Sequence, residues 1–319
     1  MVASTSRWRI ACQVIRLTWV QGSSTHGLPR TAGHDLRGAV MEMFIPPGLG
    51  WLRDLPDPRD STRRQDAVAK LLNDLRPDEN SVASVDLREY CAEPAHQGGL
   101  ATSSVHACLA LVQYFERRAS GRIVEPSRMF VYRTARRLMG WSGDSRLPLR
   151  ATLKAIVRYG LPAERYWPYD ARAVDADPDA FVYASADRIL DPVYVRLDAR
   201  GERSENTLET IKRFLAAGFA SVCGFVVCSS VSDEAEIPCP TIFDGVRGGQ
   251  AVLVVGYDDN RRIRSDRGAL LIVNSWGTEW GDRGGGWLPY TYVRENLAVD
   301  FWTLLTPQWL ASGDFHRPK

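Results

Sequence analysis

A few polar side chains stand beside apolar stretches where nucleophilic chemistry could take place. Ser103 opens a long apolar stretch and Gln97 lies six residues before it, while Gln250 precedes and Asn274 follows strongly apolar runs. A serine hydroxyl is a weak nucleophile unless a neighbouring base removes its proton. The amide of Gln250 donates and accepts hydrogen bonds but takes up no proton near pH 7. These residue types therefore argue against base-assisted catalysis by the Ser103 hydroxyl.

The stretch that Ser103 opens is predicted to be a buried helix. From Ser103 to Phe115 it is apolar on nearly every side, and charge begins only at Glu116. Such a helix lies inside a domain with its charged last turn at the surface. The hydroxyls of Thr102 and the two serines after it are predicted to cap the first turn, and Gly121 to end the helix.

The remaining pattern divides the chain into a helical part and a later β part. Further helices are predicted at Ser127–Met139, Leu149–Tyr159 and Thr207–Ala217. Strands are predicted at Val193–Leu197, Ser221–Cys228, Ala251–Tyr257, Ala269–Asn274 and Gly286–Leu288. This order indicates an α+β architecture, with a mostly helical half, a mostly antiparallel β half and a cleft between them. We expect Ser103 to reach the cleft from the helical wall.

Three motifs, in the family's order, resemble the active-site segments of papain-like cysteine peptidases (family C1). They are QGGLATS at Gln97–Ser103, GGQAVLVVGY at Gly248–Tyr257 and NSWG at Asn274–Gly277. In this family a glutamine amide and a cysteine form the oxyanion hole, a histidine is the base, and an asparagine orients that histidine. The resemblance implies the roles of oxyanion donor, nucleophile, base and orienting residue for Gln97, Ser103, Gln250 and Asn274, respectively.

The resemblance also places several residues around the substrate cleft. The positions that it implies for binding are Gly99, Ala101, Ser104, Gly249 and Trp276. Ala101 stands where the family usually has glycine, and Ser104 stands where it has tryptophan or threonine. Added methyl groups at a close approach cost affinity through overpacking. We therefore expect that the cleft no longer handles an ordinary extended peptide.

The function implied by the resemblance is that of a bacterial papain-like peptidase homologue without its catalytic cysteine and histidine. We expect a pseudoenzyme, not an enzyme, that serves as a scaffold for a protein or peptide partner in the cytoplasm. The alternative is a serine-dependent hydrolase or acyl transferase that uses Ser103, and the absence of a matched base argues against it. A peptidase copy that is losing its function remains a third reading.

Other nucleophiles and bases near Ser103 are expected to be structural. His106 is interpreted as a buried core histidine, and His96 is expected to face solvent. Cys108 lies deeper in the apolar helix, where burial raises the pKa of a thiol. We expect no cofactor and no metal. The six cysteines, Cys12, Cys91, Cys108, Cys223, Cys228 and Cys239, contain no CxxC pair and are expected to be reduced.

Composition excludes two classes of partner. The 319 residues carry a net charge of +2, without basic runs interleaved with aromatic residues, so nucleic acid is not expected. No apolar run approaches about 20 residues, so a membrane span is not expected either.

We expect five segments along the chain. Residues 1–44 are interpreted as a disordered leader or a mis-assigned start, with translation beginning at Met41 or Met43. Residues 45–85 resemble a pro-segment and are expected to stay attached as an arm. The helical half covers residues 86–188, the β half covers residues 189–306, and residues 307–319 form a tail.

Overall fold

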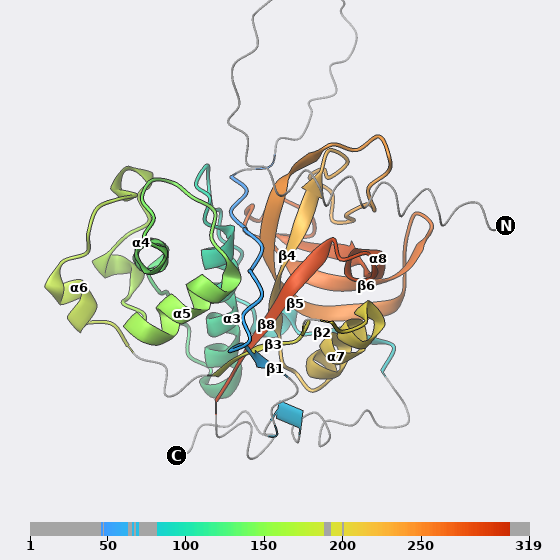
Figure 1. Cartoon of the computed structure of the whole chain (residues 1–319), viewed down its shortest axis with the longest axis horizontal. Helices are drawn as coiled ribbons and strands as arrows, with labels where there is room; N and C mark the ends of the chain where they lie inside the picture. Colours follow the sequence, from blue (N-terminus) through green and yellow to red (C-terminus); the bar gives the residue numbers. More distant parts are fainter. Residues whose placement is uncertain are drawn as a thin grey trace, which may run out of the picture.

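Helices and strands separate into two halves along the chain (Figure 1). The computed structural model describes residues 46, 48–62, 66, 68–69, 82–187, 193–199 and 201–306. The expected leader (1–44) and tail (307–319) lie outside these residues, as does most of the expected helical pattern of the arm. The predicted α+β class is confirmed by a helical half packed against a large, mainly antiparallel sheet.

The helical half is built around α3, Ser103–Ser120. Its other α-helices are α4 (Arg128–Met139), α5 (Leu149–Tyr159) and the short α6 (Ala180–Ala184). Three single 3₁₀ turns lie before and after them: η1 (Arg88–Tyr90), η2 (Glu164–Tyr166) and η3 (Ala171–Ala173). The sequence predicted α4 and α5 to within one residue, because Ser127 and Pro148 precede them and Gly140 and Gly160 follow them.

The two ends of α3 differ in how well the sequence predicted them. Gly121 ends the helix in the left-handed conformation, with φ of 68°, as predicted. At the start the prediction was wrong, because the Thr102 hydroxyl caps no backbone N–H. It lies instead 2.7 Å from the Tyr169 hydroxyl, so it ties the helix entrance to the loop after η2.

The sheet has the strand order β1-β3-β8-β4-β5-β6-β7, and β2 pairs with β5. The strands are β1 (Ser61–Thr62), β2 (Ser84–Asp86), β3 (Val193–Arg196), β4 (Ser221–Cys228), β5 (Val246–Ile263), β6 (Asp266–Val273), β7 (Gly285–Pro289) and β8 (Ala298–Leu305). Helices α7 (Ser204–Ala216) and α8 (Tyr290–Arg294) belong to the same half. Strands β1 and β2 precede α3, so residues ahead of the helical half also complete the sheet.

A segment near the start of the described chain passes between the two halves. We call Gly48–Asp54 the strap; it belongs to the blue part of the ribbon in Figure 1. The Trp51 N–H donates to the Gly249 carbonyl on the β side, at 3.1 Å. On the helical side the Leu52 N–H donates to the Leu147 carbonyl, and the Leu147 N–H donates to the Gly50 carbonyl. The strap is therefore hydrogen-bonded to both walls of the junction.

Trp51 makes the strap part of the hydrophobic core. Its side chain is 1% exposed and lies against Gly224 of β4. A methyl group at Gly224 would lie 1.9 Å from the indole Cε2 of Trp51, well inside van der Waals contact. The glycine thus leaves room for the indole, and the strap and β4 depend on each other for packing.

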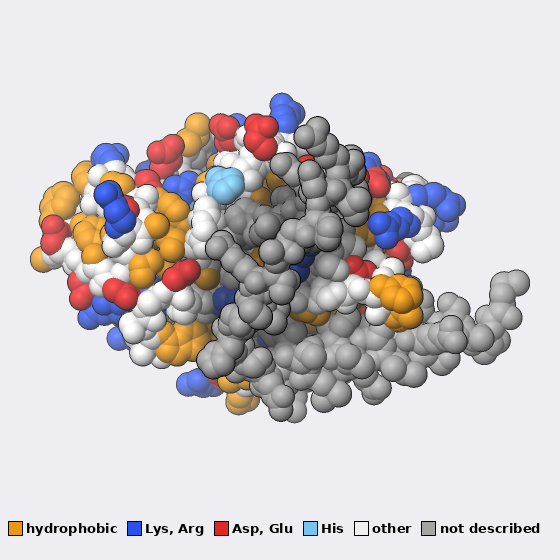
Figure 2. Space-filling model, turned by 90° about the horizontal axis from the view of Figure 1, so that it is seen from above, with side chains coloured by type: hydrophobic (Ala, Val, Ile, Leu, Met, Phe, Trp, Pro, Cys, Tyr) orange, Lys and Arg blue, Asp and Glu red, His pale blue; other side chains and the backbone are white. Residues whose placement is uncertain are grey.

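The described surface carries both signs of charge. Figure 2 shows acidic and basic side chains interspersed on the visible face. In the described residues, no helix is long and apolar enough to cross a membrane. The five cysteines of this part of the chain form no disulfide with one another.

We predict that Gly224→Ala lowers the free energy of unfolding by about 1–3 kcal/mol, since the new methyl group overlaps the rigid indole of Trp51. Urea unfolding measures this change. Gly245→Ala is the matched control, because a methyl group there meets no atom within 4 Å, and it should change stability by less than about 0.5 kcal/mol. Adding Trp51→Leu to Gly224→Ala should cost less than the sum of the two single changes. Strict additivity would contradict the contact.

Candidate active site

Ser103 lies at the first position of α3, fully buried beneath the strap. Its Oγ accepts hydrogen bonds from the Gly50 N–H and from the Ala251 N–H, both at 3.1 Å. The first of these donors belongs to the strap and the second to β5. Because Ala251 directly follows Gln250 along the chain, the Ser103 hydroxyl is bonded to the neighbour of Gln250. The hydrogen bonds of the Gln250 side-chain amide go to other residues.

Gln250 is the centre of a buried cluster of amides and hydroxyls. Its Nε2 donates to Gln97 Oε1 and to Asn274 Oδ1, both at 2.8 Å, and lies 3.2 Å from Ser275 Oγ. The Ser275 hydroxyl donates to Gln97 Oε1 at 2.7 Å, and its backbone N–H donates to Asn274 Oδ1 at 2.8 Å. The structure thus brings Gln97, Gln250 and Asn274 together. The Gln250 amide bonds to Gln97, Asn274 and Ser275, and none of its hydrogen bonds described here goes to Ser103.

The cluster is polar but holds no ionisable side chain. Gln97 and Gln250 are completely buried, and Asn274 and Ser275 nearly so. Gln250 Oε1 and Asn274 Nδ2 have no hydrogen-bond partner among the described residues. The arrangement can orient side chains, but it offers no group that takes up a proton near neutral pH.

The amide of Gln97 is already used by the chain itself. Its Nε2 donates to the carbonyls of Gly48 in the strap and Leu100, the latter at 3.0 Å. This N–H group is the donor that the family resemblance assigns to an oxyanion hole. A substrate carbonyl would therefore have to displace the carbonyl of Gly48 before it could accept this bond.

Tyr169 is a site residue whose contacts the sequence did not reveal. Its hydroxyl donates to the Gln97 carbonyl at 2.7 Å and also contacts the Thr102 hydroxyl. Burial is the main reason that the pKa of Tyr169 is raised to about 12. Only the tertiary fold reveals that the Tyr169 hydroxyl holds both ends of the loop between Gln97 and α3.

Asp144 holds the same loop from the outside. Its Oδ1 accepts the Ala101 N–H at 3.0 Å and the Tyr132 hydroxyl at 2.5 Å. Ala101 thus contributes a backbone donor to an internal contact. Sequence spacing gave no signal for this role, because Asp144 lies 43 residues away in a polar turn.

The predicted binding positions have different surroundings. The Gly99 and Leu100 carbonyls lie close to Gly48 of the strap, and the Gly249 carbonyl accepts a bond from the strap. Ser104 is fully buried, and its hydroxyl donates to the Leu147 carbonyl at 2.7 Å. Trp276 packs edge-on against Trp280, with ring centroids 5.2 Å apart. Gly99 and Gly249 thus face the strap, whereas Ser104 and Trp276 support the walls of the junction.

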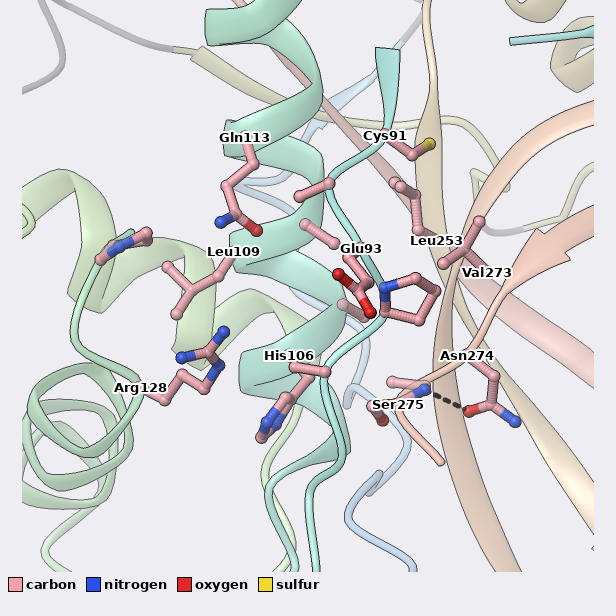
Figure 3. A pocket seen from close by; sticks show the side chains of 17 residues that line it. Cys91, Glu93, His106, Leu109, Gln113, Arg128, Leu253, Val273, Asn274 and Ser275 are labelled. Carbon is pink, nitrogen blue, oxygen red and sulfur yellow. Dashed lines mark hydrogen bonds between the residues drawn. The ribbon is translucent and has the colours of Figure 1, made fainter. Parts of the chain in front are cut away.

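His106 is a buried structural residue, as expected. In Figure 3 its ring projects away from Asn274 and Ser275. Nδ1 lies 3.0 Å from the Thr102 carbonyl, and Nε2 has no hydrogen-bond partner in the described part of the chain. Burial lowers the pKa of His106 to about 4, so the ring is neutral at pH 7. Its ring therefore supplies no base to the cluster around Gln250.

The other candidate groups are also structural. His96 is exposed, as expected, and its Nδ1 accepts the Gly98 N–H at 2.9 Å. Burial raises the pKa of the Cys108 thiol well above its ordinary value, which makes it a poor nucleophile. Over the described ranges, no three His, Cys, Asp or Glu side chains are grouped in a way that could hold a metal ion.

Sequence comparison finds a family and a relative for this chain. Residues 147–296 match the family model described as papain family cysteine protease. An uncharacterized peptidase C1-like protein, L477, of Acanthamoeba polyphaga mimivirus is 30% identical over 275 residues. That alignment covers 80% of this chain and 86% of the viral protein.

Structural comparison gives the same result for the fold. Xylellain, a cysteine protease from Xylella fastidiosa, matches with a TM-score of 0.67 at 28% identity, over 84% of this chain and 99% of that chain. A cysteine protease of Carica candamarcensis, CMS1MS2, matches with a TM-score of 0.52 at 21% identity, over 70% of this chain and 99% of that chain. The second likeness concerns the fold alone.

We predict that Gln250→Glu lowers the free energy of unfolding by about 3–5 kcal/mol at pH 7, because it buries a carboxylate against Gln97 Oε1 and Asn274 Oδ1. Burial would raise the pKa of the new carboxyl, so the loss should shrink as the pH falls toward 4. Urea unfolding at both pH values measures it. Gln113→Glu is the control: Gln113 is half-buried and donates to a single carbonyl, so its loss should be smaller. Equal losses would mean that the cluster has no special role.

Proposed function

Because the chain belongs to the papain family of cysteine peptidases (C1), we propose that it is a catalytically inactive member that serves as a binding scaffold for a protein or peptide partner. The observation that carries this proposal is the chemistry at the two reacting positions. Ser103 stands at the nucleophile position and Gln250 at the base position. The family mechanism needs a thiolate and a histidine, and this chain supplies neither there.

The contacts of Ser103 support inactivity. Both hydrogen bonds described for its Oγ are bonds that it accepts from backbone N–H groups, and no ionisable group is among these partners. Its neighbour Gln250 is held by Gln97 and Asn274. General-base assistance contributes about 10²- to 10⁴-fold to such reactions, and an amide cannot supply it.

The strap supports the second half of the proposal, because it changes where a partner can bind. Gly48 and Gly50 pass so close to the loop before α3 that a methyl group on either would lie 2.4–2.6 Å from backbone atoms. A peptide substrate cannot reach Ser103 between the two halves while the strap is docked. A partner therefore binds at the outer surface, where Ile242 and Phe243 are 62% and 90% exposed, or it displaces the strap.

A serine-dependent hydrolase is the alternative, and the geometry gives it no support. His106 is the nearest histidine along α3, but its ring is neutral and bonded to the Thr102 carbonyl. The Gln97 donor is occupied by the strap. We also propose a cytoplasmic location and a bacterial source; the absence of disulfides among the described cysteines supports the former, and the likeness to xylellain of Xylella fastidiosa supports the latter.

We predict that the purified chain hydrolyses no peptide substrate and that epoxide inhibitors directed at thiols leave residue 103 unlabelled. Fluorogenic peptide assays and intact-mass spectrometry measure the two outcomes. Turnover that vanishes in Ser103→Ala would refute inactivity. The scaffold is tested separately with the chain as bait. The control is Phe181→Ser, because Phe181 is also exposed but lies on α6 of the helical half. A stoichiometric partner should bind wild type and Phe181→Ser, and should be lost with Phe243→Ser if it uses the outer surface. A chain that retains no partner in any form would remove the scaffold proposal.

We further predict that Ser103→Cys with Gln250→His rebuilds a reactive thiolate, since Gln97 and Asn274 are still in place. Either change alone should have little effect, because the two groups act as one unit. Alkylation at mildly acidic pH, followed by mass spectrometry, reports the thiolate. The docked strap should slow the alkylation of the double variant. Adding Trp51→Ala to it should accelerate labelling by about tenfold or more, because weakening the docking of the strap by about 1.4 kcal/mol changes its equilibrium tenfold. The same slow alkylation rate in the two single variants, the double variant and the triple variant would mean that residues 103 and 250 do not act on each other.

A further inference from the structure

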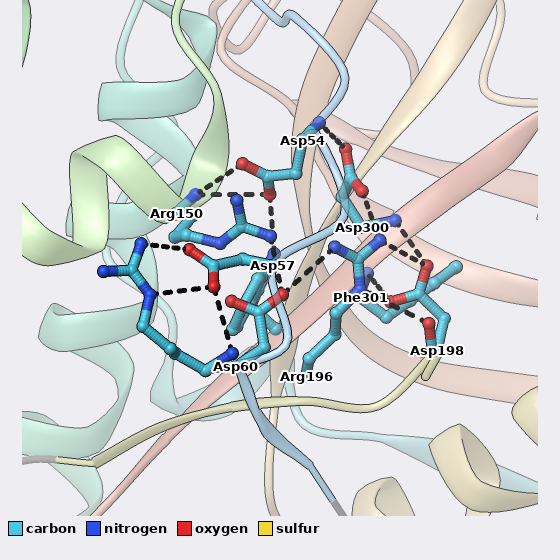
Figure 4. A network of polar contacts seen from close by, with 10 residues as sticks. Asp54, Asp57, Asp60, Arg150, Arg196, Asp198, Asp300 and Phe301 are labelled. Carbon is cyan, nitrogen blue, oxygen red and sulfur yellow. Dashed lines mark hydrogen bonds and ion pairs between the residues drawn. The ribbon is translucent and has the colours of Figure 1, made fainter. Parts of the chain in front are cut away.

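An ionic cluster anchors the C-terminal end of the strap at the junction of α5, β3 and β8. Figure 4 shows its members pointing toward one another. Four carboxyl groups meet two guanidinium groups there: Asp54, Asp60, Asp198 and Asp300 with Arg150 and Arg196. If all six were ionised, the cluster would carry an excess of two negative charges.

Asp54 and Asp300 form the direct link between the strap and the sheet. The Asp54 N–H donates to Asp300 Oδ2 at 2.7 Å. The Asp54 carboxylate accepts the Trp302 indole N–H at 2.9 Å and lies 3.3 Å from the Arg150 N–H at the start of α5. Asp300 also accepts from Arg196 at 2.6 Å. This contact joins the strap to β8 and α5 at once.

Both carboxyl groups are removed from water. Asp300 is 0% and Asp54 5% exposed, and the side chains of Asp60 and Asp198 are 8% and 13% exposed. The four carboxyl groups share the two guanidinium groups: Arg150 bonds Asp60 at 2.6 Å, and Arg196 bonds both Asp300 and Asp198, at 2.6 Å and 3.1 Å. Burying the remaining excess of negative charge is costly, so the cluster favours a neutral form of one carboxyl group, and Asp54 and Asp300 are the two that meet at the strap.

We propose that this cluster is a proton-dependent latch: the strap stays docked while Asp54 or Asp300 is protonated, and it leaves the groove when both carboxyl groups are ionised. The latch acts at the strap because the Asp54 backbone and side chain both bond across the junction. Asp198, by contrast, accepts the N–H groups of Asp300 and Phe301 and so stays within the β half.

The direction of the pH dependence follows from the surroundings of the two groups. Burial raises the pKa of Asp300 to about 8, and the carboxylates of Asp54 and Asp198 add to this effect. Burial also raises the pKa of Asp54 to about 6, against the opposing attraction of Arg150. The charged and titratable groups around them are Arg150 of α5, Arg196 of β3, Cys108 of α3, Cys223 of β4, Asp60 and Asp198. Burial raises the pKa of Asp198 as well.

Some carboxyl groups have a higher pKa in the folded chain than in the unfolded chain. Such a group contributes stability to the folded state, and the contribution is complete at pH values below its unfolded pKa, near 3.8. This contribution is lost as the pH rises through the folded pKa values, here about 6 and about 8. The strap should therefore be firmly docked in mild acid and open in mild alkali.

Hydrogen exchange of the full-length chain tests the latch. Exchange of peptides that cover 48–54 and α3 is followed by mass spectrometry from pH 6 to pH 9 and corrected for intrinsic exchange rates. In wild type, strap protection should fall at least about tenfold over this range while α3 keeps its protection. Asp300→Asn should keep the strap protected throughout, because the amide is permanently neutral. Asparagine also tolerates the φ of 58° at this position.

Asp170→Asn is the matched control, since Asp170 is paired with an exposed arginine, Arg172, away from the latch. It should leave the wild-type profile unchanged. Asp54→Asn provides a second neutral variant if Asp300→Asn does not fold. Strap protection that is constant in wild type, or that falls equally in the neutral variant, would overturn the latch. Simultaneous loss of protection in the strap and α3 would show global unfolding and would overturn it too.

Discussion

The close approach of Gly50 to the first turn of α3 is the constraint on which the arrangement of this molecule depends. Its N–H reaches Ser103 Oγ, and a methyl group on Gly50 would lie 2.4 Å from the Ser103 nitrogen. Because a glycine is at this point, the strap can lie directly on the helix N-terminus. Trp51 then enters the core beside Gly224, and Asp54 reaches β8. One short segment thus covers the nucleophile position and ties the two halves together.

Neutral side chains at residues 103 and 250 suit this covered site. A cysteine–histidine pair works as two charges, and two charges without solvent need strong compensation. The neutral amide of Gln250 donates to Asn274 and to Gln97 without bringing a charge into the site. Gln250 Oε1 nevertheless finds no partner among the described residues, so its burial has a cost. The cluster is best understood as a neutral support beneath the strap.

The sequence predicted the parts of this structure that local patterns determine. Helices α4 and α5 carry clear entrances and exits, and the three motifs around Gln97, Gln250 and Asn274 meet as expected. Strand β8 was missed, because Asp300 and Thr303 interrupt its apolar run. The role of the strap was not predictable from periodicity, because its contacts join residues that lie 53 and 246 positions apart. Only the tertiary fold brings such partners together.

The two ends of the strap are held by different physical chemistry, and this difference sets the order in which it can open. At Gly48 and Gly50 the partners are the amide of Gln97 and the hydroxyl of Ser103, which do not titrate in the neutral range. At Asp54 the partners include Asp300, whose charge changes between mild acid and mild alkali. A rise in pH therefore weakens the anchor at Asp54 first, and the bonds at the glycine end break after it. Trp51 lies between the two ends, and its removal from the core at Gly224 is the step that would expose Ser103.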